Sequence, residues 1–303
     1  MTYPSQAATR LLTGVTLAVA SVLLVGCSSD PGDAAKVSGT PPAFEHIHAL
    51  KVDPNSGDLL VATHTGLYEL AVASDGTAIA DGPVGGLDFD PMGFTLSGDT
   101  AYASGHPGPT TPDSFGSPNL GLIISTDRGK TWANVSLTGQ TDFHALTVAT
   151  PEGEGSAARI FGVDSSKSAI QRSLDGGNTW TDGAELVARD ILADPASPGT
   201  IYATTEDGLA VSSDNASSFE IVPQAPALYL LSSDPATSAI VGIDTSGAVW
   251  KQDGTDAWVR GGTVSGTPQA VTVSGDRFYV ADNRGIAFSD DDGTSWTVIN
   301  ISQ

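Results

Sequence analysis

The chain has 303 residues, 40% of them hydrophobic, with 35 Gly and 18 Pro, so it is long enough to bury one large core between many turns. Its 35 acidic residues outnumber its 13 basic ones and give a formal net charge of −22. This balance argues against a nucleic-acid partner, because no basic patch is available to neutralise phosphates.

Residues 1–26 have the features of an export signal. An apolar run follows Arg10, is too short to span a membrane comfortably, and ends in the string Leu-Val-Gly-Cys at Cys27. This string resembles the bacterial lipobox, which implies that Cys27 becomes the lipidated first residue of the mature protein. Cys27 is the only cysteine, so disulfides are excluded. We expect the polar residues 27–43 to tether a domain of residues 44–303 to the outer face of the bacterial cytoplasmic membrane.

Short apolar runs divide the rest of the chain into six similar units. Alternation and β-branched or aromatic residues predict strands throughout. The predicted inner strands are 46–53, 91–98, 142–149, 189–195, 228–235 and 269–275, and the second strands are 58–64, 100–106, 159–164, 200–205, 239–244 and 277–282. About 43 residues per unit is typical of a propeller blade. We therefore expect an all-β, six-bladed β-propeller, with seven blades as the alternative.

One turn recurs along the chain. It reads STDRGKTW at 125–132, SLDGGNTW at 173–180, SSDNASSF at 212–219 and SDDDGTSW at 289–296. Its Asp recurs at intervals of 48, 39, 39 and 38 residues, at Asp127, Asp175, Asp214, Asp253 and Asp291. Such an Asp accepts backbone N–H groups, Gly takes the positive φ, and Ser and Thr hydroxyls complete the network. We expect Trp132, Trp180 and Trp296 to pack between neighbouring sheets.

These turns resemble the Asp-box, or BNR, repeat of sialidases and related β-propellers. The resemblance implies that each turn joins the third and fourth strands of a blade and supports folding, not catalysis. It also implies that a sialidase would need three arginines from separate blades to hold the substrate carboxylate. The folded region has seven Arg, of which only Arg189 falls at a predicted channel position, with Arg284 at a mouth loop. Sialidase activity is therefore not expected.

All five histidines fall in the first three units. His46 and His48 open the inner strand of unit one, and His144 opens that of unit three, whereas His64 and His106 close second strands. Inner strands leave one face of a propeller and second strands return to it. The five imidazoles should therefore lie at one mouth of the channel, opposite the Asp-box turns.

Aligning the inner strands predicts a ring of six residues around the channel: His48, Met92, His144, Arg189, Tyr229 and Gln269. Asp90 and Asp142 lie two residues before Met92 and His144, on the same side of their strands. Neutral imidazoles with a carboxylate suit zinc or another divalent ion, and the thioether would favour copper. The alternative is that each His hydrogen-bonds a channel water or a backbone carbonyl.

A long irregular loop, 106–120, is expected to open on the same mouth, either as a binding element in which Phe115 covers a ligand or as a solvated decoration. The stretches HIHAL (46–50), ATHTGLY (62–68), ASGHPGP (103–109) and DFHAL (142–146) contain every histidine. These stretches resemble a group of bacterial exported propellers that are labelled glycosyl hydrolases. The resemblance implies that function lies at this mouth.

Three functions remain open at this point. The first is a monomeric, membrane-anchored lipoprotein whose His-rich mouth binds a metal ion or small ligand. The second is a glycoside hydrolase that acts on a glycan with Asp90 and Asp142 as its carboxylate pair. The third is a non-catalytic scaffold for other proteins of the cell envelope. The sequence does not decide whether the protein is an enzyme.

Overall fold

The computed structural model describes residues 44, 46–151, 153, 155–234, 236–252 and 257–302. Contacts divide the chain into two units, Met1–Ser38 and Gly39–Gln303, and the second contains all the described residues. The predicted signal peptide, Cys27, the predicted tether and Asp253 lie outside the described residues. Among the described residues, no helix is long and apolar enough to cross a membrane.

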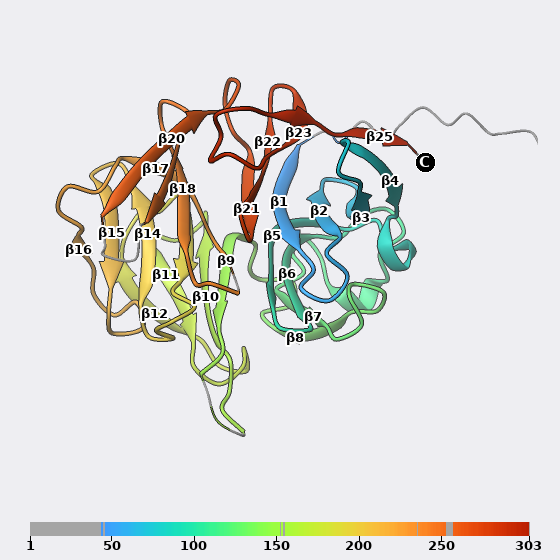
Figure 1. Cartoon of the computed structure of the whole chain (residues 1–303). Coiled ribbons are helices and arrows are strands. Elements are labelled where there is room, and N and C mark those ends of the chain that lie inside the picture. Colours follow the sequence, from blue (N-terminus) through green and yellow to red (C-terminus); the bar gives the residue numbers. More distant parts are fainter. Residues whose placement is uncertain are drawn as a thin grey trace, which may run out of the picture. The chain divides into compact units, whose positions relative to one another are not determined.

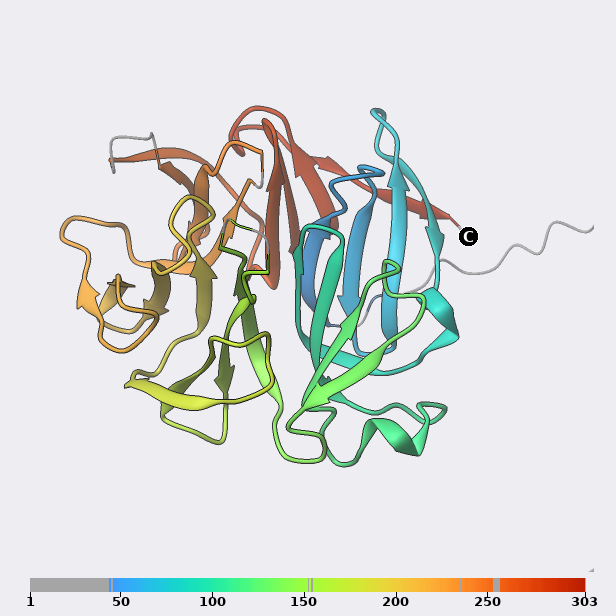
Figure 2. The same cartoon turned by 90° about the horizontal axis from the view of Figure 1, so that it is seen from below.

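The fold is all-β and consists of six sheets, each a meander of antiparallel strands (Figures 1 and 2). Blade one contains β1 (Ile47–Val52), β2 (Leu59–Thr63), β3 (Gly66–Val72) and β4 (Thr77–Asp81). Blade two contains β5 (Asp90–Ser97), β6 (Thr100–His106), β7 (Leu122–Ser125) and β8 (Ala133–Ser136). Blade three contains β9 (Phe143–Ala149), β10 (Arg159–Asp164), β11 (Ala169–Ser173) and β12 (Thr181–Glu185).

The second half of the chain repeats this pattern. Blade four contains β13 (Asp190–Ala193), β14 (Ile201–Thr205), β15 (Gly208–Ser212) and β16 (Glu220–Ile221). Blade five contains β17 (Leu228–Ser233), β18 (Ile240–Asp244), β19 (Ala248–Gln252) and β20 (Trp258–Thr263). Blade six contains β21 (Ala270–Ser274), β22 (Arg277–Asp282), β23 (Gly285–Ser289) and β24 (Thr297–Val298). Two short 3-10 turns are also present: η1 (Val84–Gly86) connects blades one and two, and η2 (Asp113–Phe115) lies in the loop between β6 and β7.

The six inner strands form a closed ring. Each inner strand contacts the next one along the chain, and β21 contacts β1. The predicted six-bladed propeller is therefore confirmed, and the seven-bladed alternative is wrong. Both faces of every sheet are buried against neighbouring blades, so the apolar core is a series of clusters at the seams between blades.

The recurring turns form one repeated hydrogen-bond network. In blade three, Ser173 Oγ donates to Asp175 Oδ1 at 2.7 Å and accepts the Gly177 amide at 2.9 Å, while Thr179 Oγ1 donates to Asp175 Oδ2 at 2.6 Å. Asp127, Asp214 and Asp291 are held in the same way. The side-chain hydroxyl and backbone amide that reach Asp175 lower the pKa of its carboxyl to about 2, so the network stays intact over the physiological pH range.

The three tryptophans of these turns lie at the seams. The ring centroid of Trp132 lies 5.3 Å from that of Phe89, and Trp180 lies 5.0 Å from Phe143. Trp132 and Trp180 each donate their indole N–H to the carbonyl three residues earlier, whereas Trp296 donates to the carbonyl of Thr263 in blade five. Each turn therefore links its own hairpin to the neighbouring sheet.

An additional strand closes the ring: β25 (Asn300–Ser302) pairs in parallel with β4 at the outer edge of blade one (Figure 1). The sequence did not reveal this strand, because three residues are too few to give an alternating pattern. Gly76 makes room for β24, which comes just before β25: φ is +85°, and a Cβ there would lie 2.7 Å from the Thr297 side chain.

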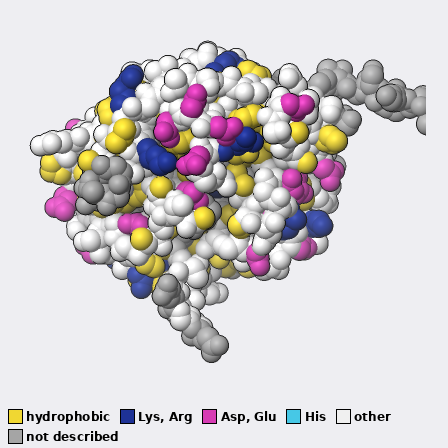
Figure 3. All heavy atoms as spheres, in the orientation of Figure 1, with side chains coloured by type: hydrophobic (Ala, Val, Ile, Leu, Met, Phe, Trp, Pro, Cys, Tyr) yellow, Lys and Arg dark blue, Asp and Glu magenta, His cyan; other side chains and the backbone are white. Residues whose placement is uncertain are grey.

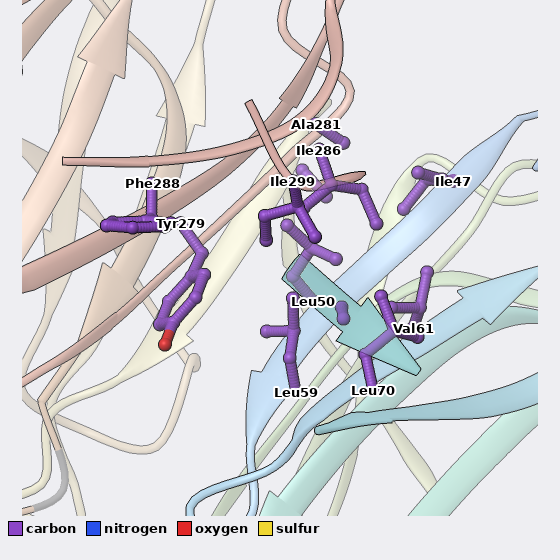
Figure 4. Packing of buried hydrophobic residues seen from close by; sticks show 12 residues of the cluster. Ile47, Leu50, Leu59, Val61, Leu70, Tyr279, Ala281, Ile286, Phe288 and Ile299 are labelled. Carbon is purple, nitrogen blue, oxygen red and sulfur yellow. The ribbon is translucent and has the colours of Figure 1, made fainter. Parts of the chain in front are cut away.

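Apolar contacts complete the seam between blades six and one. Ile299 is only 5% exposed and belongs to a cluster that joins Ile286 and Phe288 of blade six to Leu50 and Leu70 of blade one (Figure 4). At the inner end of the same seam, the Ile47 amide donates to Gln269 Oε1 at 2.9 Å.

This seam predicts the effect of truncating Ile299. The Ile299→Ala substitution should lower the free energy of unfolding by about 2–4 kcal/mol, because it leaves a cavity where the ring closes. Urea denaturation followed by tryptophan fluorescence would measure the change. Val298→Ala is a matched control, since Val298 is 39% exposed and its truncation should cost less than about 0.5 kcal/mol. Equal losses in the two variants would contradict the closure role.

Candidate functional site

Four of the six predicted ring residues lie at β-bulges. The inner-strand register shifts at His48, Met92, His144 and Tyr229, where the inner strand carries an extra residue relative to its partner. A bulge re-aims a side chain that simple alternation would place on a face of the sheet. Arg189 and Gln269 instead come directly before the first residue of β13 and β21.

All six ring residues line one hollow of about 920 Å³, which we call the mouth cavity. A narrower space of about 310 Å³, the channel cavity, runs between the inner strands and is lined by the same ring residues except Tyr229. None of the five histidines is visible on the face drawn in Figure 3. The alignment of inner strands therefore identified residues that share one end of the channel.

His48, His64 and Asp90 bring three donor groups together across the seam of blades one and two. His48 Nε2 lies 3.3 Å from His64 Nδ1 and 3.0 Å from Asp90 Oδ1, and His64 Nδ1 lies 2.8 Å from Asp90 Oδ2. Among the described residues, this is the group of three His, Cys, Asp or Glu whose donor atoms all lie within 4.8 Å of one another. Ligand atoms about 2.1 Å from a tetrahedral metal ion would be about 3.4 Å apart.

The three contacts within this cluster cannot all be hydrogen bonds, because each of the two ring nitrogens carries at most one hydrogen. His64 Nδ1 is within hydrogen-bonding distance of both His48 Nε2 and Asp90 Oδ2, but a single ring hydrogen can serve only one of these contacts. Asp90 Oδ1 is buried and makes no hydrogen bond, although His48 Nε2 lies 3.0 Å away. A buried carboxylate oxygen without a donor is costly, and a cation would satisfy the whole cluster.

A second cluster of the same composition lies at the seam of blades two and three. Asp142 Oδ2 is 2.7 Å from His144 Nε2 and 3.1 Å from His106 Nε2. His106 Nδ1 lies 3.1 Å from the Pro118 carbonyl, which can only accept, so Nδ1 must carry a hydrogen. The contact of His106 Nε2 with the carboxylate then requires a second proton or another cation. Asp142 Oδ1 is also buried without a hydrogen bond.

The two clusters adjoin, because Asp90 and His106 are directly paired residues of β5 and β6. They form one polar strip along blades one to three. Ser165 Oγ lies 3.5 Å from His144, but on the same nitrogen that contacts Asp142. This geometry is not that of a catalytic triad, in which the base uses its two ring nitrogens for the two partners.

His46 and the long loop have other roles than expected. His46 is exposed and packs edge-on against His64, with ring centroids 5.0 Å apart, and it is not part of the donor cluster. Phe115 packs against the core cluster of blades one and two, so it does not cover the mouth. The loop contributes instead through Pro118, whose carbonyl orients His106.

The arginines do not assemble into a carboxylate clamp. Arg128 binds Asp53 and Glu69, Arg277 binds Asp290, and Arg284 binds Asp282. Of the seven described Arg, only Arg189 lines the mouth cavity. Arg284, expected at a mouth loop, is held by Asp282 and lies over the Trp296 ring.

The sequence did not mark Lys51 and Asp190, which both line the channel cavity. One signal was present: Lys51 is the only lysine in the six predicted inner strands. Asp190 follows Arg189 in the predicted inner strand 189–195, and no sequence pattern distinguishes it from the other residues of that strand.

No protein-family model and no curated protein matches the chain. Among solved structures, a chain of the nidogen/laminin complex is 15% identical with a TM-score of 0.59, over 79% of this chain and 91% of that one. A GH74 xyloglucanase from Xanthomonas campestris is 17% identical with a TM-score of 0.51, over 86% and 46%. A GH74 enzyme from Niastella koreensis is 18% identical with a TM-score of 0.54, over 83% and 45%.

The chain therefore spans less than half the length of these GH74 enzymes. At such low identity, the similarity shows the propeller fold and leaves the chemistry to the residues of this chain.

The donor cluster predicts how Asp90 titrates. Burial opposes its ionisation, but the contacts with His48 and His64 and the charge of these two residues outweigh burial and hold the pKa of Asp90 below its ordinary value of 3.8. The carboxylate thus contributes stability that is present above pH 3.8 and is lost as the pH falls through the lower folded value.

His64→Ala removes one of these partners, so the pKa of Asp90 should rise in chelator-treated protein. Carboxyl carbon NMR during an acid titration would measure it. His46→Ala is the matched control and should leave the Asp90 titration unchanged. An identical Asp90 curve in wild type and His64→Ala would contradict the contact.

Proposed function

We propose that this protein binds a divalent metal ion through His48, His64 and Asp90 at the mouth of its propeller. The observation that carries the proposal is the convergence of two imidazole nitrogens on a carboxylate that keeps a buried, unbonded oxygen. Two imidazoles and one carboxylate suit zinc and similar ions, and leave a coordination position open for water or a ligand.

The second cluster supports this proposal. His106, Asp142 and His144 continue the strip of nitrogen and carboxylate donors, although their donor atoms do not all lie as close together. Met92, on the intervening inner strand, also lines the mouth cavity, and its thioether would add affinity for copper.

Metal titration tests the proposal directly. The full chain, purified in mild detergent and stripped with a chelator, should take up zinc or copper and gain thermal stability, because the ion binds only the folded site. Elemental analysis and melting curves would measure this. Asp90→Asn should weaken binding more than about 100-fold, since even outer partners of a metal ligand typically contribute 10–100-fold. His46→Ala should bind like wild type. Absence of both metal uptake and thermal shift would refute the site.

We also propose that the propeller is exported and anchored through a lipid on Cys27, as the lipobox-like string implies. Cell fractionation should find the wild-type chain with membranes and a Cys27→Ser variant released from them. A Cys27→Ser chain that stays with the membrane would contradict the lipid anchor.

Two other functions carry less support from the residues. A glycoside hydrolase would need one carboxyl group with a raised pKa as its acid, whereas the pKa of Asp90 is lowered. Turnover of xyloglucan that is lost on Asp142→Asn would favour that activity. A scaffold role would instead be indicated by envelope partners whose capture survives His48→Ala.

A further inference from the structure

The channel cavity contains an ammonium group that makes no hydrogen bond or close ion pair among the described residues. Lys51 lies on β1 and lines this cavity. Within the part of the chain that the structure describes, no group hydrogen-bonds to Lys51 or lies within 4.0 Å of it as an ion pair, so its three N–H donors face the cavity. Burial lowers the pKa of this ammonium group, and the charge of Asp190 partly offsets that effect.

Asp190 does not serve as that partner. It lies in blade four, across the channel, and its two carboxylate oxygens accept the backbone amides of Ile191 at 2.9 Å and Leu231 at 2.8 Å. Burial raises the pKa of Asp190, and these amides together with the charges of Lys51 and Arg189 oppose the rise. The Asp190 side chain is therefore already bound to the two inner strands, and the cavity separates it from Lys51.

A second cation stands at the entrance. Arg189 lines both the channel and mouth cavities, donates through Nε to the Tyr229 hydroxyl at 3.0 Å, and lies 5.0 Å from the centre of the Tyr229 ring. It makes no ion pair with any described carboxylate, unlike Arg128, Arg277 and Arg284. In a chain with 35 acidic and only 13 basic residues, two cations thus face one narrow space, where the charge of Asp190 acts on both but neither makes a close ion pair with a described residue.

We propose that the channel binds a small carboxylate, held by Lys51 with Arg189 at the entrance. A space of about 310 Å³ is large enough for an organic acid of a few carbon atoms. Thr95, Thr147 and Thr272, which also line it, add hydroxyl groups to the wall. A single negative charge is favoured over the double charge of phosphate, because Asp190 lines the same cavity and would repel the second charge.

Acetate is the probe for this site. Sodium acetate should raise the melting temperature of the full chain relative to sodium chloride at equal ionic strength, and calorimetry should give a binding isotherm. Lys51→Met should fold, because Met keeps the aliphatic part of the side chain and Asp190 keeps its two backbone amide donors. The same variant should bind acetate roughly 10- to 100-fold more weakly. Lys130→Met, which removes an exposed lysine, is the matched control and should behave like wild type.

Several outcomes would overturn the channel site. If acetate raised the melting temperature equally in wild type and Lys51→Met, acetate would bind elsewhere. If acetate did not raise the melting temperature of wild type, the channel site would be refuted. Phosphate binding more tightly than acetate would contradict the preference for a single charge. The channel site is independent of the proposed metal centre. His64→Ala should lose metal binding and keep the acetate response, whereas Lys51→Met should keep metal binding and lose the acetate response. Failure of the channel site can therefore be told apart from failure of the metal site.

Discussion

The seam between blades six and one is the contact on which the rest of the molecule depends. Every other seam joins sheets that follow each other along the chain, but this one joins residues more than 200 positions apart, as in the bond from Ile47 to Gln269. Ile299 and β25 close it from the outside, and the Gln269 side chain closes it at the channel. Only a closed ring holds six inner strands around a common space, so the mouth, the channel and their polar groups exist because this seam forms.

Much of this architecture could be predicted from the sequence, because it follows from local rules. The turns around Asp127, Asp175 and Asp291 repeat at blade length, and most predicted inner and second strands match the observed ones to within two residues. Closure of the ring could not be predicted from local sequence patterns, since β25 is short and pairs with a strand from the far end of the chain.

The candidate site was predictable in position but not in connectivity. Alignment placed His48, His144 and Arg189 at one end of the channel, where the structure has them. It could not show that Asp90 is shared by two imidazoles from the preceding blade, because that pairing depends on bulges and on the packing of adjacent sheets. Lys51 was missed for a related reason: strand alternation says which face a residue occupies, not whether a long side chain reaches the channel.

The bulges in the inner strands have a consequence for how such a mouth diversifies. A bulge confines its disturbance to one residue, and the ladder of hydrogen bonds resumes on either side, as it does from Ala49 to Val52 and from Leu230 to Ser233. A change of side chain at that residue therefore leaves the strand pairing on either side intact. Imidazole, thioether and phenol groups occupy equivalent positions of the inner strands. Substitutions at these positions can therefore change the chemistry of the channel entrance one residue at a time, while the propeller beneath keeps its fold.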